Sequence, residues 1–159
     1  MCCLRLYVVD DRPEFANKER FPEADGVIVA EYHEGLKQID IRPNTAVIVA
    51  TRGHREDDLA LEAAAFSPAG YVGLVGSRRK AILIYEELLK NGVSLDRIKA
   101  IHSPVGLDIG AKTPEEIAFS IMSEIVAFRE GRSGKSLTLE DRYVRKLAKK
   151  VTDNLVTSG

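Results

Sequence analysis

Short apolar runs alternate with segments of helical periodicity along most of the chain. The runs are almost continuously apolar, whereas a strand with one wet face would alternate apolar and polar side chains. This pattern predicts an α/β fold in which a mostly parallel sheet of about five strands carries helices on both faces. The predicted strands span residues 4–9, 26–30, 46–50, 71–75 and 98–101.

Helices are predicted between and after these strands. The clearest one follows Thr113, because the sequence combines a capping hydroxyl, Pro114 at the first helical position and Glu116 three residues after the cap. Its apolar side chains are expected to form a buried stripe of Ile117, Ile121, Ile125 and Phe128. The other predicted helices span residues 33–38, 56–66 and 78–91.

The length suits one domain with an appended tail. With 159 residues, 45% of them hydrophobic, the chain can fill one core, which we assign to residues 1–130. Residues 131–159 are predicted to form a flexible break and then a basic helix over residues 139–155. We interpret this helix as a solvated tail, and a docking element is the alternative.

Charge and hydropathy exclude some classes of partner. The formal net charge of -1 creates no field that would attract nucleic acid or an anionic membrane. The apolar stretches are too short to span a bilayer and the start lacks a secretory signal, so we expect a cytoplasmic protein. Cys2 and Cys3 are interpreted as buried or incidental, with a soft-ligand or redox pair as the alternative. No metal site is predicted, because no ligand set has diagnostic spacing.

Polar residues follow four of the predicted strands. Because the carboxyl ends of parallel strands meet at one edge of a sheet, these segments are expected to form one ligand-binding rim. Asp10 or Asp11 could accept hydrogen bonds from ribose hydroxyls, or could instead cap the turn before Pro13. The polar segments are residues 10–13, 51–54, 76–80 and 102–110.

The segment after the fourth strand has the character of an anion site. Gly76 allows close approach of the backbone, and Ser77 can donate a hydrogen bond or cap the next helix. Arg78, Arg79 and Lys80 add positive charge. An ordinary N-cap followed by a solvated basic turn is the alternative interpretation.

Two histidines also follow predicted strands. His54 comes after Arg52 and could act as an acid, a base or a ligand, although a capping cluster explains the same residues. His102 opens a loop that contains Gly106 and Asp108, and it is expected to reach the same cleft. We include all five residues among the candidate cofactor-binding positions and assign no catalytic residue.

Four motifs in this order resemble the C-terminal Rossmann domain of the XdhC/CoxI family of xanthine dehydrogenase accessory factors. The resemblance extends over about residues 9–129 and implies a Rossmann-like fold. Its specificity comes from the order and spacing of long motifs, which a lone glycine pattern would not provide. The motifs are residues 9–16, 51–54, 71–80 and 102–118.

The resemblance implies a role in handling molybdenum cofactor, a phosphorylated molybdopterin. Members of the family are thought to bind it, to promote its sulfuration with a cysteine desulfurase and to deliver it to xanthine dehydrogenase or a related molybdenum hydroxylase. Arg78, Arg79 and Lys80 would then meet the phosphate, while Asp10 or Asp11 would meet hydroxyls of a nucleotide.

The chain departs from the family pattern in two ways. It shows no counterpart of the N-terminal family domain, and none of the first strand, glycine loop and helix of the Rossmann domain. That strand would be central in the usual order 3-2-1-4-5. We therefore predict that the strands at residues 4–9 and 46–50 pair directly, or that another chain, such as a second copy in a homodimer, covers the position.

Three functions are compatible with these observations. A non-enzymatic, cofactor-binding accessory protein is the leading interpretation. An NAD(P)-dependent oxidoreductase is favoured by the Rossmann-like pattern but opposed by the missing glycine fingerprint. A protein-interaction module with a vestigial ligand site is the third, in which the basic terminal helix docks onto a partner.

Overall fold

A computed structural model describes residues 4–51 and 53–157 of the chain. The interpretations of Cys2, Cys3 and Arg52 concern residues outside this part. At His54 the description covers the backbone alone.

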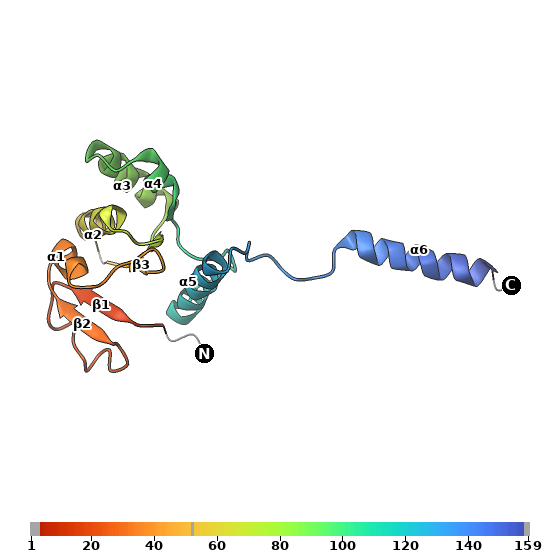
Figure 1. Ribbon diagram of the computed structural model, residues 1–159, viewed down its shortest axis with the longest axis horizontal. Coiled ribbons are helices and arrows are strands. Elements are labelled where there is room, and N and C mark those ends of the chain that lie inside the picture. The colour runs from red at the N-terminus through yellow and green to blue at the C-terminus, as the bar shows by residue number, and fades with distance from the viewer. Residues whose placement is uncertain (1–3, 52, 158–159) are drawn as a thin grey trace.

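The elements follow the predicted α/β alternation (Figure 1). The first four strands and the helices predicted from 33, 56, 78, 113 and 139 onward are confirmed within a few residues. The fifth strand is wrong in its position, because residues 98 and 99 complete a short helix capped by Ser94. The strands are β1 (Tyr7–Asp10), β2 (Gly26–Val29), β3 (Ala46–Val49), β4 (Tyr71–Leu74) and β5 (Ile101–His102). The helices are α1 (Tyr32–Lys37), α2 (His54–Phe66), α3 (Arg78–Lys90), α4 (Leu95–Lys99), α5 (Pro114–Arg129) and α6 (Asp141–Thr157).

The strands are all parallel to their neighbours but form two sheets. β1 pairs with β2, and β3, β4 and β5 pair in that order. The predicted direct pairing of the first and third strands is therefore wrong, since β1 and β3 belong to different sheets. β1 pairs only with β2, and β3 pairs on one side only, with β4, among the described strands. We call the position between the unpaired edges of β1 and β3 the sheet break.

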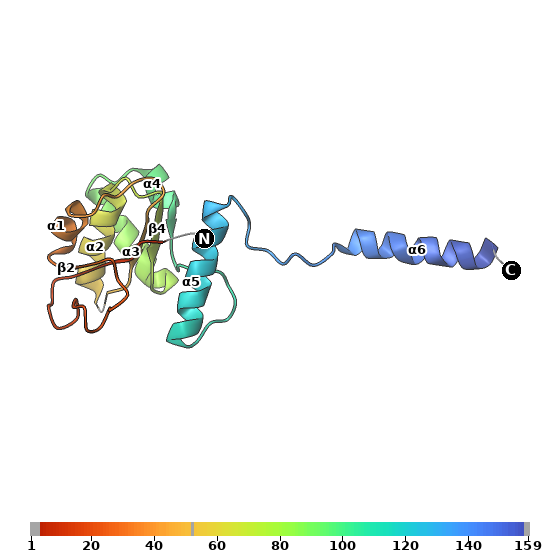
Figure 2. The same ribbon diagram turned by 60° about the horizontal axis from the view of Figure 1, so that its bottom comes forward.

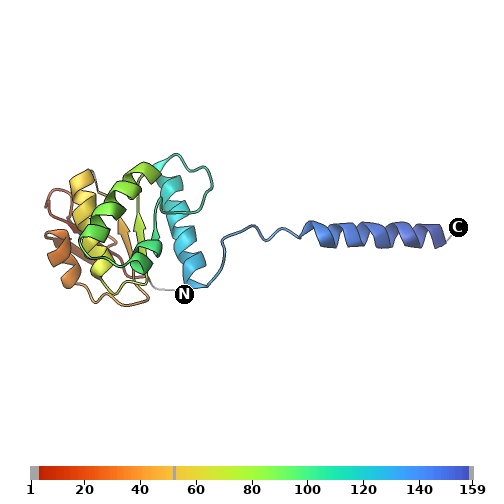
Figure 3. The same cartoon turned by 90° about the horizontal axis from the view of Figure 1, so that it is seen from above.

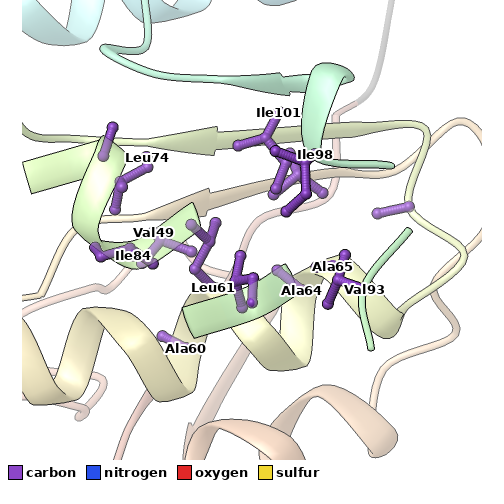
Figure 4. Packing of buried hydrophobic residues seen from close by; sticks show 14 residues of the cluster. Val49, Ala60, Leu61, Ala64, Ala65, Leu74, Ile84, Val93, Ile98 and Ile101 are labelled. Carbon is purple, nitrogen blue, oxygen red and sulfur yellow. The ribbon is translucent and has the colours of Figure 1, made fainter. Parts of the chain in front are cut away.

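The main core lies between the three-stranded sheet and helices α2 and α3. Leu74 of β4 packs there with Leu61 of α2 and Ile84 of α3 (Figure 4). These three side chains and that of Val72 are almost fully buried. Small alanines along α2 allow the helix to pack closely on the strands. The core therefore fixes the ends of β3 and β4 relative to the beginnings of α2 and α3.

Helix α5 lies on the other side of β4 and β5 (Figures 1 and 3). Tyr71 points toward it and contacts Phe128 edge to face. The predicted buried stripe of α5 is only partly confirmed: Ile121 is buried, whereas Ile117 and Phe128 are 36% and 47% exposed. The helix covers two strands and leaves much of its own apolar surface open.

Helix α6 projects away from the body at the end of an extended segment (Figures 1 and 2). Its apolar residues share one face and remain about half exposed; they are Tyr143, Val144, Leu147 and Val151. Within the described part of the chain, no helix is both long and apolar enough to cross a bilayer.

Candidate functional site

A cavity of about 380 Å³ lies beside the N-terminus of α3. Arg78, the first residue of α3, forms one side of it. The loop of residues 104–111 forms most of the remainder, and Ile117 and Ser120 of α5 complete it. The cavity therefore joins the segment after β4 with the segment after β5, two of the four polar segments expected at the rim.

Hydrogen bonds and close packing fix the cavity loop to α5. Ser120 is buried and its hydroxyl donates to the carbonyl of Leu107 at 2.6 Å. Gly106 has a φ of +106°, and a Cβ there would lie 2.4 Å from Ser120 Oγ. Only glycine fits this conformation and this space without strain. The amide of Gly106 also donates to Glu124 at 2.8 Å, so Gly106 shapes the wall and its amide is already bonded.

Ser77 acts as the N-cap of α3. Its hydroxyl accepts from the amide of Lys80 at 3.2 Å, as the capping alternative predicts. Arg78 and Arg79 are both exposed, but of the two only Arg78 lines the cavity. Gly76 lies at the turn, where a Cβ would meet the side chain of Lys80 at 3.3 Å.

Replacing Ser77 with alanine should lower the free energy of unfolding by about 1 kcal/mol, because the Lys80 amide would lose its acceptor. Chemical denaturation followed by circular dichroism would measure this loss. Ser77→Asp is the matched control, since a carboxylate also caps and is favoured at a helix N-terminus. An unchanged stability in Ser77→Ala would contradict the capping role.

Lys80 has a different role from the one expected for it. Its ammonium group pairs with Asp57 of α2, whose side chain is completely buried. The hydroxyl of Thr51 donates to the other carboxylate oxygen of Asp57 at 2.6 Å. Lys80 therefore neutralises a buried charge. It is not one of the cations available to an anion in the cavity, as the sequence had suggested.

Asp10 at the end of β1 is engaged by its own neighbour. Arg12 donates to both carboxylate oxygens, through Nε and through a terminal nitrogen, each at 2.8 Å. Partial burial acts to raise the pKa of Asp10, but the hydrogen bonds and charge of Arg12 outweigh it and leave the pKa below its usual value. Asp11 is more exposed and lies 3.7 Å from Arg12 Nε.

The charges of this acidic turn and of the start of α2 both act on Tyr32, the first residue of α1. Burial is the main reason that the pKa of Tyr32 is raised, and the charges of Asp11, Asp10 and Glu56 raise it further. Asp10 and Asp11 are absent from the cavity lining, so the structure does not bring them to the same cavity as Arg78.

His102 lies beneath α5 rather than in the cavity. Its ring stacks on Tyr71 with centroids 4.3 Å apart, and its Nδ1 lies 3.3 Å from Glu124 Oε1. The hydroxyl of Tyr71 donates to Glu124 Oε2 at 2.5 Å. Burial acts to raise the pKa of Glu124, but the hydrogen bonds from Tyr71 and Gly106 and the contact with His102 lower it overall.

Sequence reasoning missed Glu124 and Tyr71. The signal for Glu124 was present, since a carboxylate at this position interrupts the apolar spacing of Ile117, Ile121 and Phe128 on one helix face. The structure brings Arg78, Gly106 and Asp108 together at the cavity. The other candidates lie apart: Gly76 and Ser77 at the adjoining turn, Asp10 and Asp11 farther along the rim, and His102 under α5. Among the described residues, no three His, Cys, Asp or Glu side chains are grouped as metal ligands would be.

Residues 2–125 match the family described as the XdhC Rossmann domain. The chain belongs to this family. The match includes all five strands, the cavity loop and most of α5, so the expected Rossmann-like α/β fold is confirmed.

Two curated proteins are similar to this chain. The uncharacterized protein YqeB of Escherichia coli (strain K12) is 37% identical over 130 residues, which cover 81% of this chain and 24% of YqeB. A probable xanthine dehydrogenase subunit of Bacillus subtilis (strain 168) is 33% identical over 125 residues, covering 79% of this chain and 36% of that protein. This chain thus spans between about a quarter and just over a third of these relatives.

A solved structure shows the same fold. It is described as the crystal structure of a xanthine dehydrogenase from Bacillus halodurans. Its sequence is 33% identical and the superposition has a TM-score of 0.65, covering 79% of this chain and 36% of that one.

Proposed function

We propose that this domain serves a xanthine dehydrogenase or a related molybdenum hydroxylase as an accessory factor. In this proposal it acts in the cytoplasm, binds molybdenum cofactor and works with a cysteine desulfurase before the cofactor is inserted. The membership of the XdhC Rossmann domain family carries the proposal. The name of the Bacillus subtilis relative, a probable xanthine dehydrogenase subunit, points to the same enzyme.

The cavity suits the phosphate of such a cofactor at one particular place. Arg78 supplies a guanidinium group at the cavity, and the first amides of α3 add the positive end of a helix dipole. The loop amides of Gly106, Leu107 and Ile109 are already bonded within the protein. Phosphate recognition would therefore rest on Arg78 and the start of α3, with Asp108 limiting the net positive charge.

The role assigned to these residues is binding and orientation. Molybdenum cofactor would supply the redox chemistry in the enzyme that receives it. Arg78 would hold the phosphate, and the Gly106 turn would shape the opposite wall. Asp10 is a poor acceptor for ribose hydroxyls, because two guanidinium nitrogens of Arg12 already donate to its carboxylate, which leaves the more exposed Asp11 for that role.

Replacing Arg78 with alanine should weaken binding of molybdenum cofactor about tenfold, the loss expected for one charge-assisted hydrogen bond. Arg79→Ala is the matched control, because it removes the same charge from a neighbouring residue outside the cavity lining, and it should change the affinity less than about twofold. Isothermal titration calorimetry of the whole chain would measure both. Equal losses in the two variants would refute the cavity as the phosphate site.

A titration with NADH separates the two ligand classes. We expect heat from molybdenum cofactor and none from NADH at matched concentrations. Binding of NADH with no response to the cofactor would overturn the accessory-factor proposal in favour of an oxidoreductase. If neither ligand produced heat, cofactor binding by this domain would be refuted and a protein-interaction module would be the remaining function.

A further inference from the structure

The apolar face of α6 is open to solvent. Val144, Leu147 and Val151 follow one another at intervals of three and four residues, which places them on one side of the helix. Each of these side chains is at least half exposed. In proteins, most of the stability of a helix of this length comes from packing of its apolar face. We therefore expect α6 to dock on another surface.

The opposite face of α6 is strongly basic. The helix contains five basic residues and two acidic ones, which is a net charge of +3. Lys150 follows Leu147 by three positions and so borders the apolar face. A surface that receives α6 should therefore combine apolar side chains with carboxylates. The basic residues are Arg142, Arg145, Lys146, Lys149 and Lys150.

A cavity between α2 and α3 has this combination. Its volume is about 280 Å³, and it is lined by Asp58, Leu83, Ile84, Glu86 and Glu87. We call it the α2–α3 groove. All three charged side chains of this lining are carboxylates. Leu83 is about half exposed and Ile84 is almost fully buried, so the groove has an apolar floor and acidic borders.

Lys90 is a cation close to the groove. It pairs with Glu87 at 2.8 Å and with Glu86 at 3.2 Å, so one positive charge offsets one of these two carboxylates. Glu62 of α2, one turn after Asp58, adds a carboxylate that accepts a hydrogen bond from Asn91 at the end of α3. The surroundings of the groove therefore remain acidic, and a basic helix is favoured there most strongly at low salt.

The structure directs α6 away from the groove of its own copy. In Figures 1, 2 and 3, α5 lies between α6 and the helices α2 and α3. The segment that leads to α6 passes beside the cavity loop, where a Cβ at Gly134 would lie 2.9 Å from the side chain of Leu107. We call residues 135–157 the arm. The arm extends from the α5 side of the body, where it can reach a neighbouring molecule.

We propose that α6 of one copy docks in the α2–α3 groove of a second copy, and that the two copies exchange their arms reciprocally. Val144, Leu147 and Val151 would pack on Leu83, in the helix-in-groove mode of recognition. Lys150 would approach the acidic border. Two copies related by a two-fold axis would form two such contacts and a closed dimer. The proposal does not depend on the ligand of the cavity at Arg78.

Helix α5 is a poorer acceptor for α6. Phe119, Met122 and Val126 are exposed on it and form an apolar stripe at the same spacing. The charges at the end of this stripe are of both signs, since Arg129 pairs with Glu130 at 2.7 Å. The lining of the groove carries acidic charge only, so charge complementarity favours the groove.

Sedimentation equilibrium and hydrogen exchange of the whole chain test the association. We expect a dimer whose dissociation constant rises at least about tenfold when the salt concentration is raised from about 0.05 M to about 0.5 M. The amides of α6 should exchange at least about tenfold more slowly in the dimer than at dilutions at which the chain is monomeric. The amides of β4 serve as an internal control and should not change with concentration.

A matched pair of variants tests the groove. Leu83→Lys removes apolar surface from the groove and adds a cation, so it should weaken the dimer at least about tenfold. Ile82→Lys is the control, because the neighbouring side chain is also exposed but does not line the groove. It should associate as the unchanged chain does. Leu147→Glu places a charge in the apolar face of α6 and should weaken the dimer as much as Leu83→Lys does.

Mixing the two weakened variants separates exchange between copies from docking within one copy. Leu147→Glu keeps an unchanged groove and Leu83→Lys keeps an unchanged arm, so a mixed dimer regains one of its two contacts. The mixture should therefore associate at least about fivefold more tightly than either variant alone. Docking of each arm on its own body predicts no such rescue.

Each outcome supports or overturns the exchange of arms. Rescue on mixing, with Ile82→Lys unaffected, supports it. A monomer overturns it, whether its α6 amides exchange rapidly, exchange slowly because α6 lies on its own body, or are slowed only by vesicles that contain anionic lipid. A dimer that neither Leu83→Lys nor Leu147→Glu weakens would pair elsewhere, for example across the sheet break, and would equally overturn it.

Discussion

Replacing Lys80 with methionine should lower the free energy of unfolding by about 3–5 kcal/mol, the range found when one partner of a buried ion pair is removed. Asp57 is completely buried, and Lys80 is the cation that pairs with it. Methionine keeps the apolar stem of the lysine, so the loss would come mainly from the unpaired carboxylate. Urea denaturation of the two proteins measures the difference.

A double-mutant cycle provides the control for this prediction. Asp57→Asn combined with Lys80→Met removes both charges while keeping a hydrogen-bonding group for Thr51. The double variant should therefore be more stable than Lys80→Met alone. If Lys80→Met costs less than about 1 kcal/mol, the value typical of an exposed pair, the ion pair does not hold the starts of α2 and α3 together.

Replacing Glu124 with leucine should lower the free energy of unfolding by about 2–4 kcal/mol. The Tyr71 hydroxyl and the Gly106 amide would each lose their acceptor in a partly buried position, and one such loss costs about 1–3 kcal/mol. Glu124→Gln keeps a carbonyl oxygen of the same reach and should cost less. Equal losses in the two variants would show that shape, rather than hydrogen bonding, determines the role of Glu124.

The pH dependence of stability gives an independent check on Glu124. Its pKa is lowered in the folded protein, so its contribution is complete above the unfolded value of about 4.3 and is lost as the pH falls through the folded pKa. The unfolding free energy should fall more steeply below about pH 4.3 in the unchanged chain than in Glu124→Gln. Parallel curves for the two proteins would contradict this assignment.

The fold was largely predictable because apolar runs and helix caps are local signals. The capping box at Thr113 and Glu116 is present as expected. The short helix α4 was missed because five residues are too few for periodicity to show. It depends instead on contacts distant in sequence, since Arg97 donates to the carbonyls of Ala65, in the last turn of α2, and of Ser67, the residue that follows the helix.

The candidate site was less predictable, because which charges face one another depends on packing. Spacing alone made Lys80 equivalent to Arg78, yet one turn of α3 directs Lys80 to Asp57 and Arg78 to the cavity. The pairing of Asp10 with Arg12 was similarly hidden, although only two positions separate them. The sequence identified the polar residues that follow the strands. It could not show which of them face the cavity, which form ion pairs and which cap a helix.

The bond between Ser120 and Leu107 has a consequence for communication within the molecule. It ties one wall of the cavity to a helix whose other side chains, Phe119 and Met122 among them, are open to solvent. A protein that shifted α5 on binding there would reshape the cavity. By thermodynamic reciprocity, a small molecule bound in the cavity would then change the affinity of α5 for that protein by the same factor. Binding of the protein and release of the small molecule would thus be coupled through α5, with the central strands unmoved.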